Sequence, residues 1–228
     1  MINVGIIGYG KMGRIRHQVI SSIKNAQVDS VYDPANIITE IEKVQSPVQI
    51  IKNPKIDAVF ICTPNYLNKP LTIQILQTGK HVFCEKPPAF TAKDVEEIRT
   101  VEKESGKVLM YGFNHRYHES VQEALRILRS CELGEVINMR GMYGKAKLIT
   151  FNQPDWRTKR EIAGGGVLLD QGIHMVDLMR LFGGEFNQVH SLISNNHWGY
   201  DVEDNAYALM RSDDGIVAML NSSATQWR

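Results

Sequence analysis

The first half of the chain alternates short, unbroken apolar runs with amphipathic segments, and this alternation restricts the fold more than any other feature. The apolar runs fall within residues 2–8, 26–33, 56–64, 80–87 and 107–113. Segments with helical periodicity cover residues 11–23, 66–79 and 91–105. Gly79 is the last residue of one of these segments and Gly106 follows another, as glycines that end helices do. Strands that are apolar at every position are buried on both faces, so we predict an α/β fold with a doubly wound parallel sheet.

The second half of the chain has a different pattern. A predicted helix at Glu119–Arg129 leads into strand-like runs, which lie within residues 135–144, 186–196, 205–212 and 216–227. A further helix is expected at Val167–Phe182, and Asp214-Gly215 is a hairpin signal between two of the runs. This mixture predicts an α+β domain with an open antiparallel sheet. The expected domains are residues 1–113 and 114–228.

Charge and cysteine content argue against several classes of protein. The chain has 228 residues, with 26 Lys or Arg against 25 Asp or Glu and 43% hydrophobic residues. Balanced charge gives no field that would attract nucleic acid or an anionic membrane surface. We see no signal segment and no apolar run that approaches the length of a membrane span. Because 3 cysteines without CxxC spacing cannot all pair within one chain, we expect a reduced, cytoplasmic setting.

Three glycines stand at the end of the first apolar run, in the sequence GYGKMG. Gly8, Gly10 and Gly13 have the spacing GxGxxG, and Asp33 follows where the second strand should end. In dinucleotide-binding folds the first Gly permits a tight turn, the second lets the pyrophosphate approach, and the third lets the helix pack on the strand. The helix N-terminus then offers free N–H groups to the phosphates. The structural alternative is a plain glycine turn with a solvated Asp.

The acid at the end of the second strand also indicates which cofactor is preferred. Asp33 would accept hydrogen bonds from ribose hydroxyls and repel a 2′-phosphate, which favours NAD over NADP. Arg14 and Arg16 are expected to face solvent from the first helix, although either could counter an extra phosphate.

Two further strand ends carry polar residues. Lys86 lies in Cys84–Pro88 and is restricted by the proline that follows it, so it could be held toward a substrate oxygen. In Cys62–Asn65, Pro64 and Asn65 could line a cofactor cleft. Ligands of open α/β folds bind at the carboxyl edge of the sheet, where both segments should lie. A surface salt bridge at the first segment and a plain turn at the second are equally good interpretations.

The segment Gly164–Phe182 is the most informative for chemistry. On a helix, Asp170, His174 and Asp177 form one polar stripe, whereas apolar residues cover most of the remaining surface. Titratable groups on a largely buried helix are costly unless paired or used, so the stripe is expected to face a cleft. An Asp one turn before a His can orient the imidazole as a base, although a core histidine is the structural alternative. No third ligand has usable spacing, so no metal is expected.

Two polar stretches supply candidates for binding substrate. Asn114 and Arg116 follow the run at 107–113, and Trp156 and Arg157 precede the triple glycine. Forked donors and a stacking ring suit sugar hydroxyls or a phosphate. For each residue singly, a structural surface role is at least as good an interpretation.

Taken together, these motifs resemble those of the Gfo/Idh/MocA oxidoreductases. The series is GYGKMG, an Asp ending the second strand, CTPN, CEKP, and GGG followed by D-x-x-x-H, in the family's order along the whole chain. The resemblance implies a Rossmann domain followed by a substrate domain on an open antiparallel sheet, often used for oligomer contacts. It also implies NAD(P)-dependent oxidation or reduction of sugars, nucleotide sugars or cyclitols. The phrase GFNHRYH and the C-terminal tail are similar to members encoded among bacterial surface-polysaccharide genes.

The resemblance also implies roles for single residues. It implies that Lys86 contacts substrate and the nicotinamide ribose, that Asp170 binds substrate and that His174 is catalytic. The cofactor-binding set that it implies is Gly8, Gly10, Lys11, Met12, Gly13, Asp33, Thr63, Pro64, Asn65, Glu85 and Lys86.

The sequence departs from the family pattern in two places. Asn68 stands where many members have His in TPNxxH. The chain ends at Arg228, soon after an apparent middle strand of the second sheet, whereas the family continues with further strands. We therefore expect a truncated substrate domain, whose apolar sheet would need covering or dimerising.

These observations lead to a functional hypothesis with two alternatives. The hypothesis is hydride transfer between a nicotinamide and a secondary alcohol of a sugar-like substrate, with His174 as base, Lys86 steadying the oxygen and Asp170 orienting. One alternative is an NAD-dependent glycosidase or lyase that oxidises its substrate transiently. The other is a non-catalytic NAD-binding regulator. The sequence names neither the sugar, the carbon oxidised nor the direction, and it suggests a homo-oligomer without giving its size.

Overall fold

The computed structural model describes all residues except 36–38, 147–155 and 227–228. The chain divides into two compact units, Met1–Gly112 and Phe113–Arg228, each of which is described by itself. No helix in the described part of the chain is both long enough and apolar enough to cross a membrane.

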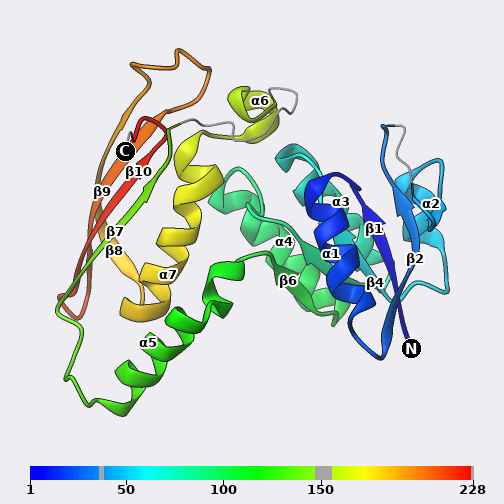
Figure 1. Cartoon of the computed structure of the whole chain (residues 1–228), viewed down its shortest axis with the longest axis horizontal. Coiled ribbons are helices and arrows are strands. Elements are labelled where there is room, and N and C mark those ends of the chain that lie inside the picture. Colours follow the sequence, from blue (N-terminus) through cyan, green and yellow to red (C-terminus); the bar gives the residue numbers. More distant parts are fainter. Residues whose placement is uncertain (36–38, 147–155, 227–228) are drawn as a thin grey trace. The chain divides into compact units, whose positions relative to one another are not determined.

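The first unit is built on one parallel sheet. Its elements are β1 (Ile2–Ile7), α1 (Lys11–Ser21), β2 (Ala26–Tyr32), β3 (Glu42–Lys43), α2 (Pro47–Lys52), β4 (Ala58–Ile61), α3 (Asn68–Gln77), β5 (His81–Cys84), α4 (Ala92–Ser105) and β6 (Leu109–Tyr111). The six strands have the order β3-β2-β1-β4-β5-β6, and each strand is parallel to its neighbours (Figure 1). The predicted doubly wound sheet is confirmed. The strand order reverses direction between β1 and β4, and the carboxyl ends beside such a reversal form the ligand crevice of these folds.

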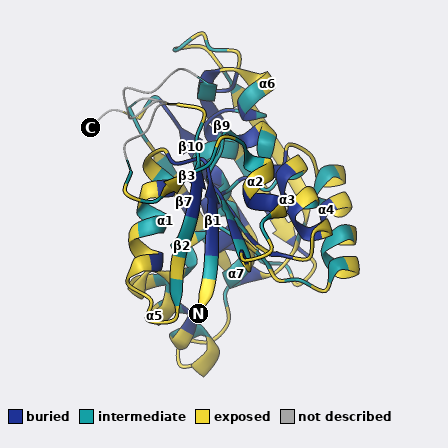
Figure 2. Ribbon diagram, turned by 90° about the vertical axis from the view of Figure 1, so that its right-hand side faces the viewer, coloured by how far each residue is buried: buried dark blue, intermediate teal, exposed yellow. Residues whose placement is uncertain are grey.

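The sheet has a hydrophobic core on each of its faces. Val4 and Ile6 of β1 pack in one cluster with Ile20 of α1, and Ile7 packs in the other with residues of α2 and α3 such as Ile75. This alternation explains the unbroken apolar run, because both sides of β1 are buried along its second half (Figure 2). The carboxyl end of β1 is therefore held firmly where the glycine turn begins.

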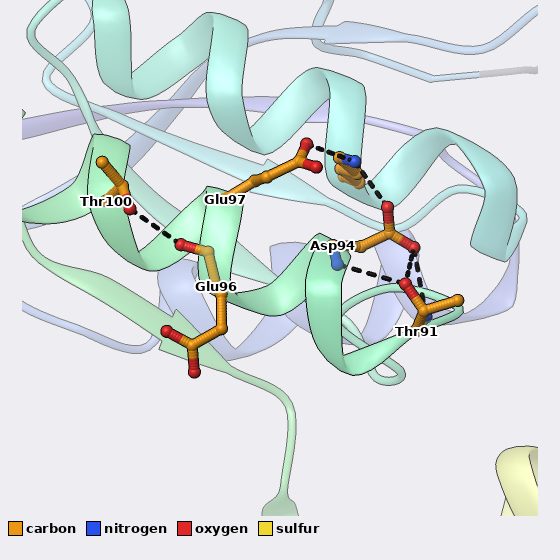
Figure 3. A network of polar contacts seen from close by, with 6 residues as sticks. Thr91, Asp94, Glu96, Glu97 and Thr100 are labelled. Atoms are coloured by element: carbon orange, nitrogen blue, oxygen red, sulfur yellow. Dashed lines mark hydrogen bonds and ion pairs between the residues drawn. The ribbon is translucent and has the colours of Figure 1, made fainter.

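Two helices of this unit are joined by a polar network. The Lys69 ammonium of α3 lies 2.5 Å from an Asp94 oxygen and 2.6 Å from a Glu97 oxygen of α4 (Figure 3). Asp94 also forms a capping box with Thr91 at the start of α4, and Gly106 ends that helix with φ +61°. These contacts fix the two helices that follow β4 and β5.

The second unit combines a mixed sheet with helices. Its elements are α5 (Glu119–Ser130), β7 (Asn138–Gly144), α6 (Arg160–Ala163), α7 (Ile173–Gly183), β8 (Phe186–Ser194), β9 (Asn205–Ser212) and β10 (Val217–Ser223). Residues Asn114–Tyr117 form a 3₁₀ turn, and Leu168–Gly172 form a π turn that leads into α7. The hairpin between β9 and β10 turns at Gly215, with φ +88°.

The prediction of a wholly antiparallel second sheet is wrong for one strand pair. The sheet order is β7-β10-β9-β8, and β7 pairs with β10 in parallel. The physical reason is the connection: helices return the chain between β7 and β8, and two hairpin reversals then give β10 the direction of β7. The core of this sheet includes Met179 of α7, with Met210, Ala218 and Leu220 of the strands.

Candidate functional site

Two of the three glycines after β1 are required by the protein's own backbone. Gly8 has φ +90°, and a Cβ there would lie 2.5 Å from the Cys62 carbonyl oxygen. A Cβ on Gly13 would lie 2.2 Å from the Gly8 carbonyl oxygen. Side chains at either position would collide with backbone that cannot easily move. These two glycines bring β1, β4 and the start of α1 close together.

The middle glycine has no such requirement. Gly10 has φ −71°, which any residue adopts, and a Cβ there would meet no protein atom within 4 Å. It is the N-cap of α1, whose first turn carries no acidic residue. The free N–H groups and partial positive charge of a helix start attract an anion. Gly10 therefore leaves open space at a position suited to a phosphate.

The acid after β2 is fixed against this turn. One Asp33 carboxylate oxygen accepts the Tyr9 backbone N–H at 2.7 Å, and the other accepts the Ala35 N–H at 2.9 Å. Asp33 is therefore held by the backbone of the glycine turn and does not simply extend into solvent. Each carboxylate oxygen retains lone pairs for a further donor.

The expectation that Arg14 and Arg16 both face solvent is wrong for Arg16. Its guanidinium donates from Nε and Nη2 to one Glu85 oxygen, at 2.8 and 2.6 Å, and it stacks over the Phe83 ring. The Arg16 and Glu85 side chains are only 16% and 10% exposed. Sequence periodicity placed Arg16 on a solvent face, but a buried carboxylate after β5 required a cation. Arg14 is exposed.

The predicted loops after β4 and β5 meet at a buried side chain. Asn68, the first residue of α3, donates to the carbonyl oxygens of Glu85 and Pro87, which flank Lys86. Its amide oxygen accepts the Thr63 hydroxyl at 3.3 Å. Lys86 is half-buried and precedes a cis peptide bond.

The remaining predicted cofactor residues lie around the same carboxyl edge. Asn65 is buried, whereas Met12, Thr63 and Pro64 are partly buried and Lys11 is exposed. The carboxyl edge of the first unit thus carries every residue of the predicted cofactor-binding set.

In the second unit, the triple glycine has a structural role. Gly164 ends α6 with φ +81°, and a Cβ on Gly166 would lie 2.0 Å from the Glu203 carbonyl oxygen. The Glu203 carboxylate accepts the backbone N–H groups of Gly166 at 2.8 Å and Leu168 at 3.2 Å. A buried carboxylate therefore caps the helical segment that carries the predicted catalytic residues.

That helical segment begins with a wider turn than the predicted α-helix. Residues Leu168–Gly172 have π geometry, and the Ser222 hydroxyl of β10 donates to the Val167 carbonyl at 3.1 Å. The regular spacing assumed for Asp170, His174 and Asp177 is therefore not kept through this turn. The three side chains contact different residues: Asp170 lies near Arg157, His174 stacks on His115 and Asp177 pairs with Arg116.

His174 is 5% exposed and lies in a group of aromatic rings. The His115 ring stacks on it with centroids 4.0 Å apart and planes 16° apart, and the Phe113 ring meets it edge-on at 6.1 Å. The Tyr143 ring of β7 also stacks with His115, at 5.9 Å. The imidazole is thus held in one orientation by packing.

Asp177 forms an ion pair that fixes the 3₁₀ turn. Arg116 donates from Nε to one Asp177 oxygen at 2.7 Å and from Nη2 to the other at 2.5 Å. The carboxylate is 9% exposed, and its hydrogen bonds raise the pKa of Arg116. Since both oxygens are engaged, Asp177 and Arg116 hold the turn that carries His115 against α7.

Asp170 lies near the two residues predicted from the polar run. An Asp170 oxygen lies 3.6 Å from Arg157 Nε, and the Arg157 guanidinium stacks on the Trp156 ring at 4.2 Å. Burial, together with the Asp170 charge, raises the pKa of Tyr143. The residue before Trp156 lies outside the described residues, and Asn114 is exposed.

Sequence reasoning missed three residues of this region. His115 lies in the stretch GFNHRYH, Tyr143 lies in the predicted strand at 135–144, and Glu203 lies 37 positions from the Gly166 amide that it caps. Only the GFNHRYH stretch carried a local signal, a cluster of aromatic and basic residues. The stacking and the capping depend on contacts between segments distant in sequence.

Comparison with protein-family models agrees with this geometry. A model described as an oxidoreductase family with an NAD-binding Rossmann fold matches residues 2–113, and one described as the GFO/IDH/MocA C-terminal domain matches residues 121–228. The chain belongs to the Gfo/Idh/MocA oxidoreductase family. The resemblance predicted from the motifs is confirmed.

Several members of the Gfo/Idh/MocA family are similar to the chain along most of its length. Levoglucosan dehydrogenase of Pseudarthrobacter phenanthrenivorans is 29% identical over 85% of the chain, and 2,7-anhydro-N-acetylneuraminate hydratase of Escherichia coli is 28% identical over 100% of it. The chain spans 54% and 63% of the lengths of these two relatives. A solved structure of levoglucosan dehydrogenase with NADH and levoglucosan is 26% identical, with a TM-score of 0.90 over 99% of the chain and 67% of that structure.

Proposed function

We propose that the protein is an NAD-dependent oxidoreductase that acts on a secondary alcohol of a sugar, nucleotide sugar or cyclitol. The observation that carries the proposal is Gly10, a glycine that neither the backbone conformation nor the packing of the protein requires. The open space at this helix start fits a pyrophosphate, and Asp33 beside it fits the ribose hydroxyls. A 2′-phosphate would be repelled by Asp33, so NAD is the proposed cofactor rather than NADP.

In the proposed reaction, two side chains of this chain, His174 and Lys86, have different roles. When bound, NAD supplies the hydride acceptor or donor. His174 takes the hydroxyl proton as general base, because a neutral imidazole accepts a proton near pH 7. The Lys86 ammonium stabilises negative charge on the same substrate oxygen. Asp170 orients the imidazole or binds a neighbouring hydroxyl.

The second unit offers groups for holding a sugar. Trp156 and Arg157 lie next to Asp170 and present a ring and a fork of N–H donors, and Asn114 is exposed. We keep these three as proposed substrate-binding residues. Arg116 is better described as a positioning residue, because two of its donors are already used by Asp177.

A second candidate reaction has a specific observation in its favour. A relative that matches 100% of the chain is named a hydratase rather than a dehydrogenase. The same residues could remove or add water, or cleave a glycosidic bond, with only transient oxidation of the substrate. Turnover of a substrate without net NADH formation favours this candidate.

The exposed face of the second sheet supports a proposal about assembly. Alternate residues on β9 and β10 point away from the α7 side, and the strand register places one large apolar residue each of β7 and β8 on the same face. The large apolar side chains that gather there are 46% to 76% exposed: Met142, Leu192, Tyr207, Leu209 and Met219. Their face includes a hollow of about 950 Å³. A contiguous apolar face of this kind marks an interface. We propose that a second copy of this chain covers it.

The experiment for the reaction combines a substrate panel with two variants. Free sugars, nucleotide sugars and cyclitols are tested for NADH formation, and turnover is followed separately by chromatography. Lys86→Ala and His174→Ala are expected to lose at least 100-fold in kcat. Lys93→Ala, which changes an exposed lysine, is the matched control. Wild-type rates in both site variants refute the proposal, and NADH binding without any turnover favours a non-catalytic regulator.

The experiment for assembly measures mass by light scattering. Leu209→Lys places a charge in the exposed face and is expected to convert an oligomer into monomers. Val19→Lys, which changes an exposed residue of α1, is the control. A wild-type protein that is monomeric at micromolar concentration contradicts this part of the proposal.

A further inference from the structure

The buried Asn68 side chain forms hydrogen bonds to the backbone on both sides of Lys86. Asn68 is 0% exposed, and its Nδ2 group donates to the Pro87 carbonyl oxygen at 2.8 Å and the Glu85 carbonyl oxygen at 3.3 Å. Carbonyl oxygens only accept hydrogen bonds, so they fix which way the amide points. Lys86 therefore lies between two carbonyls that are held by the same NH₂ group.

The other end of the Asn68 side chain reaches the neighbouring loop. The Thr63 hydroxyl, after β4, donates to the Asn68 amide oxygen at 3.3 Å. The loops after β4 and β5 are thus tied together through the first residue of α3. The buried Asn68 side chain is held in one conformation by these bonds, because rotating away from a partner would leave a buried polar group without a hydrogen bond.

From this geometry we propose that Asn68 is a positioning residue that aims Lys86 by holding both of its flanking carbonyls. The inference rests on the proposed role of Lys86 in the reaction. A lysine side chain is a flexible stem of four carbons. Its ammonium can therefore be placed accurately against a substrate only if the backbone that carries it is held in position. The Arg16 bond to Glu85 restrains the side chain of the preceding residue, whereas Asn68 restrains the backbone at Lys86 itself.

The test replaces the amide while keeping its volume. Asn68→Leu is close in shape and removes both donors and the acceptor. Asn68→His keeps one N–H and is expected to restore part of the effect. The matched control is Thr72→Val, which changes another fully buried residue one turn along α3, where the hydroxyl lies beside the Cys84 thiol.

Two measurements separate positioning from general stability. Amide hydrogen exchange without cofactor is expected to become at least tenfold faster at Lys86 and Ala89 in Asn68→Leu, with α4 and β1 unchanged. In turnover, kcat is expected to fall about 10- to 100-fold while KM for NAD changes less than threefold, because a small misplacement affects the reacting geometry more than binding. Thr72→Val is expected to leave both measurements within twofold of wild type.

The outcomes distinguish this inference from the proposed function. Wild-type kcat in Lys86→Ala refutes the role of Lys86 and, with it, the inference. An inactive Lys86→Ala with unchanged exchange and kcat in Asn68→Leu refutes the positioning role alone. If Asn68→Leu does not fold, Asn68→His decides the question: unchanged exchange and kcat in that variant overturn the inference, and intermediate losses support it.

Discussion

The ion pair between Arg116 and Asp177 gives the most quantitative prediction. Two hydrogen bonds of 2.7 and 2.5 Å join a carboxylate that is 9% exposed to a guanidinium that is 42% exposed. The two partners are therefore unequal. Arg116→Ala leaves the buried Asp177 carboxylate without its cation, whereas Asp177→Asn leaves the Arg116 guanidinium, which water can reach.

The expected losses follow from this difference in exposure. Breaking a fully buried pair costs about 3–5 kcal/mol, and solvent access on the arginine side lowers the expected cost of Arg116→Ala to about 2–3 kcal/mol. Asp177→Asn keeps one oxygen acceptor and is expected to cost about 1–2 kcal/mol. In the double variant the two losses should not add, and the coupling energy is expected to be about 1–2 kcal/mol.

Urea unfolding followed by tryptophan fluorescence measures these losses. All 3 tryptophans lie within residues 113–228, so the signal reports the second unit. The double variant completes a thermodynamic cycle. Arg126→Ala, which breaks an exposed pair with Glu123, is the control, and its loss is expected to be no larger than that of an ordinary surface substitution.

Two results would refute this reasoning. One is a loss in Arg116→Ala no larger than in Arg126→Ala. The other is strict additivity in the double variant, which would mean that the two side chains do not stabilise each other. Either result would also remove the reason for describing Arg116 as holding the turn with His115 in place.

Three further predictions concern single positions. Gly166→Ala is expected to destabilise the second unit by more than about 3 kcal/mol in urea unfolding, because its Cβ would lie 2.0 Å from a backbone oxygen; a loss below 1 kcal/mol would contradict the close approach. Gly10→Ala is expected to leave thermal stability unchanged but to weaken NADH binding at least tenfold by fluorescence titration, and unchanged affinity would count against the phosphate site. For Asp204, burial raises the pKa, but hydrogen bonds from His197, Asn205 and Trp198 outweigh it and the pKa is lowered from 3.8. Its contribution to stability is present above pH 4 and is lost as pH falls through the lowered value, so Asp204→Asn is expected to flatten the acid limb of stability against pH.

Local patterns were sufficient for much of the first unit. The alternation of unbroken apolar runs with helical segments predicted the parallel sheet, and the spacing of Gly8 and Gly13 predicted a tight turn. The close approach of both glycines to neighbouring backbone atoms explains that turn. These features are local, because a buried strand, a helix start and a tight turn each depend on residues close together in sequence. The site motifs of the first unit could also be predicted, because they stand at the ends of strands and the carboxyl ends of parallel strands lie at the same edge of the sheet.

Contacts between distant segments decided the rest. The burial of Arg16 against Glu85, the cap that Glu203 places on the helical segment and the stack of His115 on His174 join residues 37 to 69 positions apart. The parallel pairing of β7 with β10 likewise depended on a connection through helices and two hairpins. Short-range periodicity carries no information on such pairings, since they are set by which surfaces meet once the elements have formed. The sequence by itself therefore determined the elements, the turn chemistry and the family, whereas the tertiary structure decided which charged and aromatic side chains became partners.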